Sequence, residues 1–271
     1  MNTFEETKIK TANAYNAASD LFDHPSNSFW NRFGYNTVEH LNLLPKEYVL
    51  DVCSGTGASA LPAAIKVGSE GKVVAVDLAD KLLNEAKIKA KTKNLNNIEF
   101  RVADMLNLGY PDASFDAVIC VFGIFFVPDM VSAIQELWRQ VRVGGRLAMT
   151  TWGENLFEPA NSLFWDSIKN ERPELFKGFN PWDRISTPDS LKDVLQQAGL
   201  NQVNIIVEHA THPLNTPEDW WTLVMGSGYR GTLDQLNTEA LQRVKEINLN
   251  QLKNKSVTDI QANVIYAVAT K

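Results

Sequence analysis

The chain has 271 residues, of which 44% are apolar and 21% charged, as is usual for a folded globular protein. A net charge of −6 and an isoelectric point near 5.3 argue against a nucleic-acid partner, because proteins that bind phosphate backbones usually carry a basic surface. The two cysteines, Cys53 and Cys120, lie in apolar runs and indicate a reducing compartment. With no signal peptide and no run of about 20 apolar residues, we expect a cytoplasmic protein without a membrane span.

Residues 1–45 are expected to be helical and mostly polar. From Tyr48 onward, short apolar runs alternate with helix-length segments near 58–67, 80–94 and 130–142. The apolar runs predict five strands: Tyr48–Val52, Val73–Val76, Ile98–Val102, Ala117–Val121 and Arg146–Thr151. Such alternation predicts a parallel sheet with helices on both faces. Gly144 and Gly145 are expected to end the third helix, because glycine favours the left-handed cap conformation.

The alternation stops after Trp152, and two segments, 153–187 and 215–258, interrupt it. The first is rich in proline and aromatic residues and has no clear period, and the second is irregular and helical. Between them, Thr187 and Pro188 begin a helix, because threonine is a good N-cap and proline fits the first turn. Further strands are expected at Val203–Glu208 and Val264–Ala269.

We therefore expect residues 1–271 to form a single domain with helical lid insertions. Its core would be 46–152, completed by 188–214 and 259–271, and its cap and lid would be 1–45, 153–187 and 215–258.

The strongest motif runs from Val49 to Ala58 and reads V-L-D-V-C-S-G-T-G-A. A strand enters a glycine turn that opens a helix, where free N–H groups and missing side chains let a ligand approach the backbone. By themselves, Gly55 and Gly57 would equally fit a dinucleotide site or a tight turn without a ligand. Asp51 favours a different ligand, because a carboxylate inside a strand is costly to bury unless a cation, such as a ligand ammonium group, pairs with it.

Acidic residues also follow the next two strands. Asp77 ends the second strand, where it is placed either to hydrogen-bond ribose hydroxyls or to cap the following helix. Asp104 ends the third strand, and Phe122 follows the fourth. Because ligands of open α/β sheets bind beyond the carboxyl ends of parallel strands, we expect these residues and Gly55 to converge on one crevice.

Together these segments resemble a class I methyltransferase of the group that includes the ubiquinone and menaquinone biosynthesis methyltransferases. The matching pieces, within about residues 12–152, are Leu50–Gly57, Val76–Asp77, Val102–Met105, Phe115–Val118 and Val143–Leu147. The resemblance implies an α/β, Rossmann-like fold with a seven-stranded, mostly parallel sheet whose last strand is antiparallel. It also implies S-adenosyl-L-methionine as cofactor and methyl transfer to a small molecule by in-line displacement.

The resemblance assigns the glycine turn to the methionine part of the cofactor. Gly55 and Gly57 would pass beneath it, beside Ser54, and Asp51 would lie near its amino group. Further along the chain, Asp77 and the adjacent Leu78 belong to the ribose side of the site.

The rest of the cofactor would be held by later segments and by the amino-terminal cap. Asp104 and Met105 would bracket the adenine, and Val121 and Phe122 would line the wall near the methyl donor. Tyr15, in the short tract Ala-Tyr-Asn, would close over the cofactor, unless it is packed in the core.

The chain departs from the quinone-type members in its long insertions. Tryptophans of these insertions, with Trp30 and Trp152, suggest an aromatic lid over a substrate other than a quinone, although each could equally be part of the core. The insertion tryptophans are Trp165, Trp182, Trp220 and Trp221.

Three histidines are candidates for a general base, the role histidine most often fills. His209 and His212 lie at or just past the end of the sixth strand, and His24 lies in the amino-terminal cap. Strand alternation would place His209 and His212 on opposite faces if the strand extends that far. For each of the three, a surface or packing role is the alternative.

Two clusters in the insertions combine an aromatic residue with an arginine: Asn180–Arg184 and Gly226–Gly231. Arginine can bind a carboxylate or phosphate through two hydrogen bonds while the aromatic ring stacks on the substrate. We expect Tyr229 and Arg230 to contact the substrate, the alternative being a glycine turn with ion pairs that anchor a loop.

The sequence shows no metal-ligand spacing, so we expect no metal. An RNA or protein methyltransferase remains the alternative function, followed by a NAD-dependent oxidoreductase, which Asp51 disfavours, and a cofactor-binding protein without catalysis. We expect a small-molecule substrate, no nucleic acid and no membrane span, and the fold is compatible with a homo-oligomer.

Overall fold

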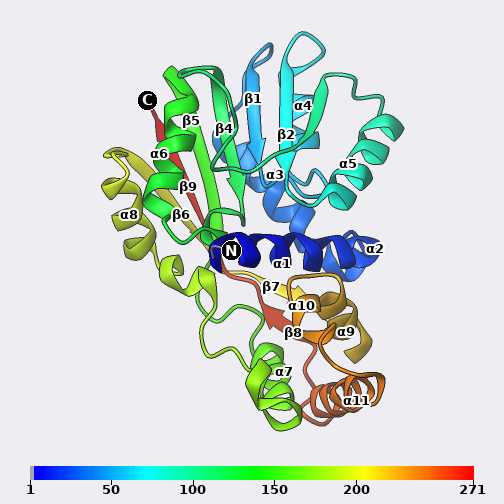
Figure 1. Cartoon of the computed structure of the whole chain (residues 1–271). Helices are drawn as coiled ribbons and strands as arrows, with labels where there is room; N and C mark the ends of the chain where they lie inside the picture. Colours follow the sequence, from blue (N-terminus) through cyan, green and yellow to red (C-terminus); the bar gives the residue numbers. More distant parts are fainter. Residues whose placement is uncertain (1–2) are drawn as a thin grey trace.

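The computed structural model describes residues 3–271 and contains a seven-stranded sheet in the order β3-β2-β1-β4-β5-β9-β6 (Figure 1). Strands β1 to β5 run parallel to one another, and β9 is antiparallel to both β5 and β6. The predicted Rossmann-like fold is therefore confirmed. The strands of this sheet are β1 (Tyr48–Val52), β2 (Lys72–Asp77), β3 (Ile98–Val102), β4 (Phe115–Val121), β5 (Val141–Trp152), β6 (Val203–Glu208) and β9 (Val264–Thr270).

Both faces of the sheet are buried, which explains why its central strands read as continuous apolar runs. In β1, Val49 packs into the core beneath α3 (Phe29–Leu41) and α4 (Ala60–Val67), whereas Leu50 packs into the core on the other face. That second core also receives the apolar residues of α6 (Met130–Gln140) and α8 (Pro188–Gln197). The α5 helix (Asp80–Thr92) packs beside β2 and β3.

The prediction that Gly144 and Gly145 end the third helix is wrong. The α6 helix ends at Gln140, and Gly144 and Gly145 lie inside the long strand β5. A Cβ on Gly145 would lie 2.6 Å from the carbonyl oxygen of Asp116, at the place where the pairing of β4 and β5 shifts register. The glycine pair therefore serves close strand packing and a bulge rather than a helix cap.

The two insertions form a helical group below the carboxyl edge of the sheet (Figure 1). Its helices share a buried polar contact, in which Asn248 accepts from the indole of Trp220 at 3.2 Å and donates to Ser167 at 2.7 Å. The helices are α7 (Ala160–Glu171), α9 (Pro217–Met225), α10 (Arg230–Leu233) and α11 (Thr238–Asn254).

Two short strands outside the main sheet, β7 (Thr211–Pro213) and β8 (Asp259–Gln261), pair antiparallel with each other between α1 and the helices α7 and α11 (Figure 1). These two strands are not among those expected from the sequence. They have three residues each, too few to show an alternating pattern.

The amino-terminal cap consists of α1 (Thr3–Ala17), α2 (Ser19–Phe22), the 3₁₀ helix η1 (Pro25–Asn27) and α3. In Figure 1, α1 lies between the carboxyl edge of the sheet and the helical group. Within residues 3–271, no helix is long and apolar enough to cross a bilayer.

Candidate functional site

A cavity of about 1180 Å³, counted with its open mouth, lies at the carboxyl ends of β1 to β4, beneath α1. Its lining comes from the glycine turn, the strand ends, the amino-terminal cap and one residue of the insertions. The lining residues that bear on the argument are Phe4, Lys8, Thr11, Tyr15, Phe22, Trp30, Cys53, Ser54, Gly55, Ser59, Asp77, Leu78, Asp104, Met105, Val121, Phe122, Phe125, Phe126, Val127, Trp152 and Trp182.

The glycine turn follows β1 and precedes α4, which begins at Ala60, two residues later than expected. Gly57 has a φ of +85°, and a Cβ there would lie 2.0 Å from Leu61 Cδ1, so no larger residue fits without rearrangement. The backbone N–H of Ser54 donates to the carbonyl of Val76 at 3.0 Å, which ties the turn to β2. The turn is therefore held in one conformation with its backbone facing the cavity.

Asp51 is fully buried directly behind this turn. Its Oδ2 accepts a hydrogen bond from the hydroxyl of Ser59 at 2.8 Å, whereas its Oδ1 has no partner. Burial raises the pKa of Asp51 to about 7, and the nearby charge of Asp77 contributes in the same direction. A buried acceptor without a donor is costly, so this carboxyl group favours a cationic or N–H-bearing ligand.

Asp77 joins the end of β2 to the glycine turn. Its Oδ2 accepts from the N–H of Gly55 and its Oδ1 from the N–H of Ala79, both at 2.8 Å. Burial raises the pKa of Asp77, and the backbone hydrogen bonds partly offset this. A carboxylate has about four lone-pair positions, so Asp77 can still accept a hydrogen bond from a ligand.

Asp104 lies at the far end of the cavity, where α1 reaches it. Its Oδ1 accepts from the N–H of Leu106 at 3.0 Å, and its Oδ2 pairs with Lys8 Nζ at 2.8 Å. Lys8 is not among the site residues expected from the sequence. The spacing of Phe4, Lys8, Thr11 and Tyr15 along α1 follows one helix face, and this pattern could have identified the cavity side of the helix.

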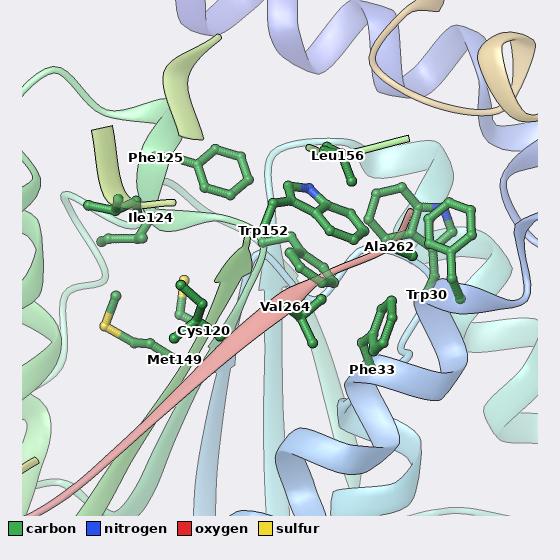
Figure 2. Packing of buried hydrophobic residues seen from close by; sticks show 14 of the residues in the cluster. Trp30, Phe33, Cys120, Ile124, Phe125, Met149, Trp152, Leu156, Ala262 and Val264 are labelled. Atoms are coloured by element: carbon green, nitrogen blue, oxygen red, sulfur yellow. The ribbon is translucent and has the colours of Figure 1, made fainter. Parts of the chain in front are cut away.

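Aromatic side chains form much of the remaining cavity wall. Phe122 stacks on Trp152 with ring centroids 3.8 Å apart, and Trp30 stacks on Phe22 at 5.0 Å. Figure 2 shows Trp30 and Phe33 reaching from α3 toward Trp152. Phe122 has a φ of +52°, which is rare for an aromatic residue and marks a backbone held in a strained conformation beside the cavity.

Nine of the eleven residues that the sequence analysis assigned to a cofactor line this cavity, and Asp51 and Gly57 lie outside its lining. The nine are Tyr15, Ser54, Gly55, Asp77, Leu78, Asp104, Met105, Val121 and Phe122. Tyr15 contacts the rings of Phe22 and Phe126 at the cavity wall, and burial raises its pKa.

The three candidate histidines do not line the cavity. His24 is exposed, and its Nδ1 accepts from the N–H of Ser26 at 3.2 Å at the start of η1. The β6 strand ends at Glu208, so the alternation of faces does not extend to the other two. His209 is exposed, and His212 is buried with its Nε2 donating to the carbonyl of Ser26 at 2.8 Å.

Tyr229 and Arg230 also lie away from the cavity lining, and both have partners within the helical group. The hydroxyl of Tyr229 donates to Asn161 at 2.7 Å, and its ring packs against Phe164. Arg230 forms an ion pair with Asp234 at 2.6 Å, one turn later in the chain. The structure thus places these side chains in packing and ion-pair contacts.

The lid insertions contribute little to the cavity lining. From 153–187 only Trp182 lines it, and no residue of 215–258 does so. Trp165, Trp220 and Trp221 are buried in the apolar core. Among residues 3–271, no group of three or more His, Cys, Asp or Glu side chains is arranged to hold a metal ion.

Comparisons with known proteins agree with this geometry. A model described as the ubiE/COQ5 methyltransferase family matches residues 4–166. The chain is 34% identical over 144 residues to an aklanonic acid methyltransferase from a Streptomyces species, covering 53% of this chain and 66% of that one. It is 31% identical over 133 residues to a demethylmenaquinone methyltransferase from Oceanobacillus iheyensis, covering 49% and 55%.

These two alignments span less than two thirds of the relatives' own lengths. Among solved structures, a putative methyltransferase from an antibiotic biosynthesis pathway of Anabaena variabilis superimposes with a TM-score of 0.63 at 18% identity, covering 89% of this chain and 97% of that one. At this identity the likeness concerns the fold.

Proposed function

Because this chain belongs to the ubiE/COQ5 methyltransferase family, whose cofactor is S-adenosyl-L-methionine, we propose that it transfers the methyl group of that cofactor to a small-molecule acceptor. The observation that carries the proposal is the buried Asp51, whose Oδ1 lacks a partner directly behind a glycine turn that faces the cavity. The names of the two relatives, which mention a quinone and an organic acid, support a small acceptor.

The residues around the glycine turn fit the amino-acid part of the cofactor. A ligand ammonium group would give Asp51 the cationic partner that it lacks, and the unpartnered hydroxyl of Ser54 is a further polar group there. Gly55 lets the ligand approach the backbone, because it lines the cavity and carries no side chain, and Gly57 keeps the turn packed against Leu61.

The strand ends fit the nucleoside part. The remaining lone-pair positions of Asp77 suit ribose hydroxyls, with Leu78 beside them. Asp104 and Met105 lie at the end of the cavity that remains for the adenine. Asp104 is held there by Lys8, so α1 contributes to this end of the site as well.

The bound cofactor supplies an activated methyl group on a sulfonium, and the chain supplies alignment and exclusion of water. Val121 and the stacked pair of Phe122 and Trp152 form the wall proposed to lie beside the methyl donor. Tyr15 and the rest of α1 cover the cavity. The two free thiols, Cys53 and Cys120, support our proposal of a cytoplasmic location.

The acceptor class can be tested with methyl-labelled S-adenosylmethionine. We expect the purified protein, incubated with an extract of the source cells, to transfer label to the small-molecule fraction. The measurement is the radioactivity in small metabolites, RNA and protein after separation, with boiled protein as control. Label confined to RNA or protein would contradict the proposal and favour a macromolecular acceptor.

Binding of S-adenosylhomocysteine is expected to strengthen as the pH rises from 5.5 to 7.5. Burial raises the pKa of Asp51 to about 7, so the unliganded protein carries a proton on this carboxyl group below that pH. A ligand ammonium favours the carboxylate, so binding must release the proton, and the affinity rises by up to about tenfold per pH unit below pH 7. Burial also raises the pKa of Asp77, which acts in the same direction.

Isothermal titration calorimetry in two buffers of different ionisation enthalpy measures this proton release. The Asp51→Asn variant serves as the control, because it keeps the shape of the side chain but has no proton to release in this range. The same pH dependence in Asp51→Asn and wild type would show that Asp51 is not the titrating group.

The raised pKa of Asp51 also predicts how the free energy of unfolding of the unliganded protein changes with pH. Between about pH 4 and pH 7 the folded chain binds this proton more tightly than the unfolded chain does. The contribution of Asp51 to the free energy of unfolding therefore falls as the pH rises through this window.

A further inference from the structure

The cluster Asn180–Arg184, which combines an aromatic residue with an arginine, lies at the 3₁₀ helix η4 (Pro181–Ile185), with Asn180 as its N-cap. Asp183 accepts from the N–H of Asn180 at 2.7 Å, which fixes the start of this helix. Trp182 lines the cavity from here. Arg184, two residues later, is not part of the cavity lining.

The guanidinium of Arg184 is occupied by backbone carbonyl groups. Its Nη2 donates to Phe125 at 3.1 Å and to Val127 at 2.9 Å, and its Nη1 donates to Pro128 at 3.0 Å. Its Nε also donates to the carbonyl of Pro181 at 3.3 Å. With four of its five N–H groups in use, Arg184 cannot also bind a substrate carboxylate through two hydrogen bonds.

The segment that Arg184 holds is part of the cavity wall. Phe125, Phe126 and Val127 all line the cavity, three to five residues after Phe122. Phe125 also packs edge-on against Trp182, with ring centroids 5.7 Å apart. The side chain of Arg184 therefore joins the backbone of the β4–α6 connection to the η4 segment. The same two segments also meet in the contact between Phe125 and Trp182.

We infer that Arg184 is a positioning residue for the acceptor: it fixes the 125–128 backbone, and through it the aromatic wall, in the shape that the acceptor contacts. This inference rests on the proposed methyl transfer. A planar guanidinium is suited to this role, because its N–H groups point to several carbonyls at fixed angles, which an ammonium group cannot match. Arg184 thus acts through Phe125 and Val127, without touching the reacting atoms.

The test compares Arg184→Met, which keeps the apolar stem, with Arg184→Lys, which keeps the charge. Arg172→Met is the matched control, because Arg172 belongs to the same insertion and pairs with Glu174 at its surface. Labelled S-adenosylmethionine and a dilution series of the small-molecule extract give the apparent KM and kcat. Hydrogen–deuterium exchange of residues 124–130, with S-adenosylhomocysteine bound, reports the loop directly.

For Arg184→Met we expect the apparent KM to rise about tenfold, with kcat changed by less than about threefold and the affinity for S-adenosylhomocysteine unchanged. Exchange in 124–130 should become about tenfold faster, because the backbone is no longer held. Arg184→Lys should lie between Arg184→Met and wild type in both measurements, and Arg172→Met should match the wild type.

Two results would overturn the inference. One is an Arg184→Met protein with unchanged KM and unchanged exchange. The other is an Arg184→Lys protein with the KM of the wild type but with exchange as fast as in Arg184→Met. The positive charge alone would then set the KM, as it would if residue 184 bound an acidic acceptor directly. If the wild type transfers no label to metabolites, the proposed function fails, and the exchange data still show whether Arg184 holds the loop.

Discussion

Replacing Asp77 by alanine is expected to abolish the rise in melting temperature that S-adenosylhomocysteine gives the wild-type protein. The variant loses the acceptors proposed for the ribose, the hydrogen bond from Gly55 that holds the glycine turn to β2, and the hydrogen bond from Ala79 at the start of α5. Hydrogen bonds to a charged group contribute about 1.5–3 kcal/mol each, so the affinity should fall by about 100-fold or more. Thermal unfolding and calorimetric titration measure the two effects.

Two further variants make this result specific. Glu85→Ala removes an exposed carboxylate from α5 and should respond to the ligand as the wild type does. Asp77→Asn keeps one acceptor oxygen and should bind with intermediate affinity. An Asp77→Ala protein that is folded and still stabilised by S-adenosylhomocysteine would show that the cofactor lies elsewhere.

Replacing Gly34 by alanine should lower both the stability and the affinity for S-adenosylhomocysteine. Gly34 lies where α3 crosses the glycine turn, and a Cβ there would lie 2.6 Å from the backbone carbon and oxygen of Ala58. Backbone atoms cannot move aside as a flexible side chain can, so the helix or the turn must shift. We expect the free energy of unfolding to fall by about 1–3 kcal/mol, the usual cost of overpacking.

Chemical denaturation measures this loss, and calorimetric titration measures the affinity of the folded variant. Gly178→Ala is the matched control, because the nearest atom to a Cβ there is Phe176 Cε1 at 3.6 Å. It should change stability by less than about 0.5 kcal/mol. Equal stability of the two variants would mean that α3 can withdraw from the turn without cost.

The sequence by itself determined the central strands of the sheet and the edge of the sheet at which the cavity lies. The apolar runs of 48–152 are local signals, because a strand buried on both faces must be apolar throughout. Such runs are therefore expected in the central strands of the sheet. The same holds for Gly55 and Asp77, since a strand end followed by a glycine turn has a fixed position in this fold. Nine of the assigned residues accordingly lie on one cavity.

Only the tertiary structure decided which polar side chains were left for a ligand. Arg184, Arg230 and Tyr229 carry the right chemistry for substrate contact, yet carbonyl groups, Asp234 and Asn161 use their hydrogen-bonding groups. Asp234 is four residues from Arg230, Asn161 is 68 residues from Tyr229, and three of the four carbonyl groups that Arg184 contacts are more than 50 residues away. No local pattern reveals all of these partners.

The same reason explains Lys8 and the aromatic wall. Lys8 meets Asp104 across 96 residues, and Trp30, Phe122 and Trp152 meet from three separate elements. A local pattern fixes the secondary structure of a segment and the face that it buries. The partner on that face follows from how distant segments pack, and the free energy of that packing is a property of the whole fold.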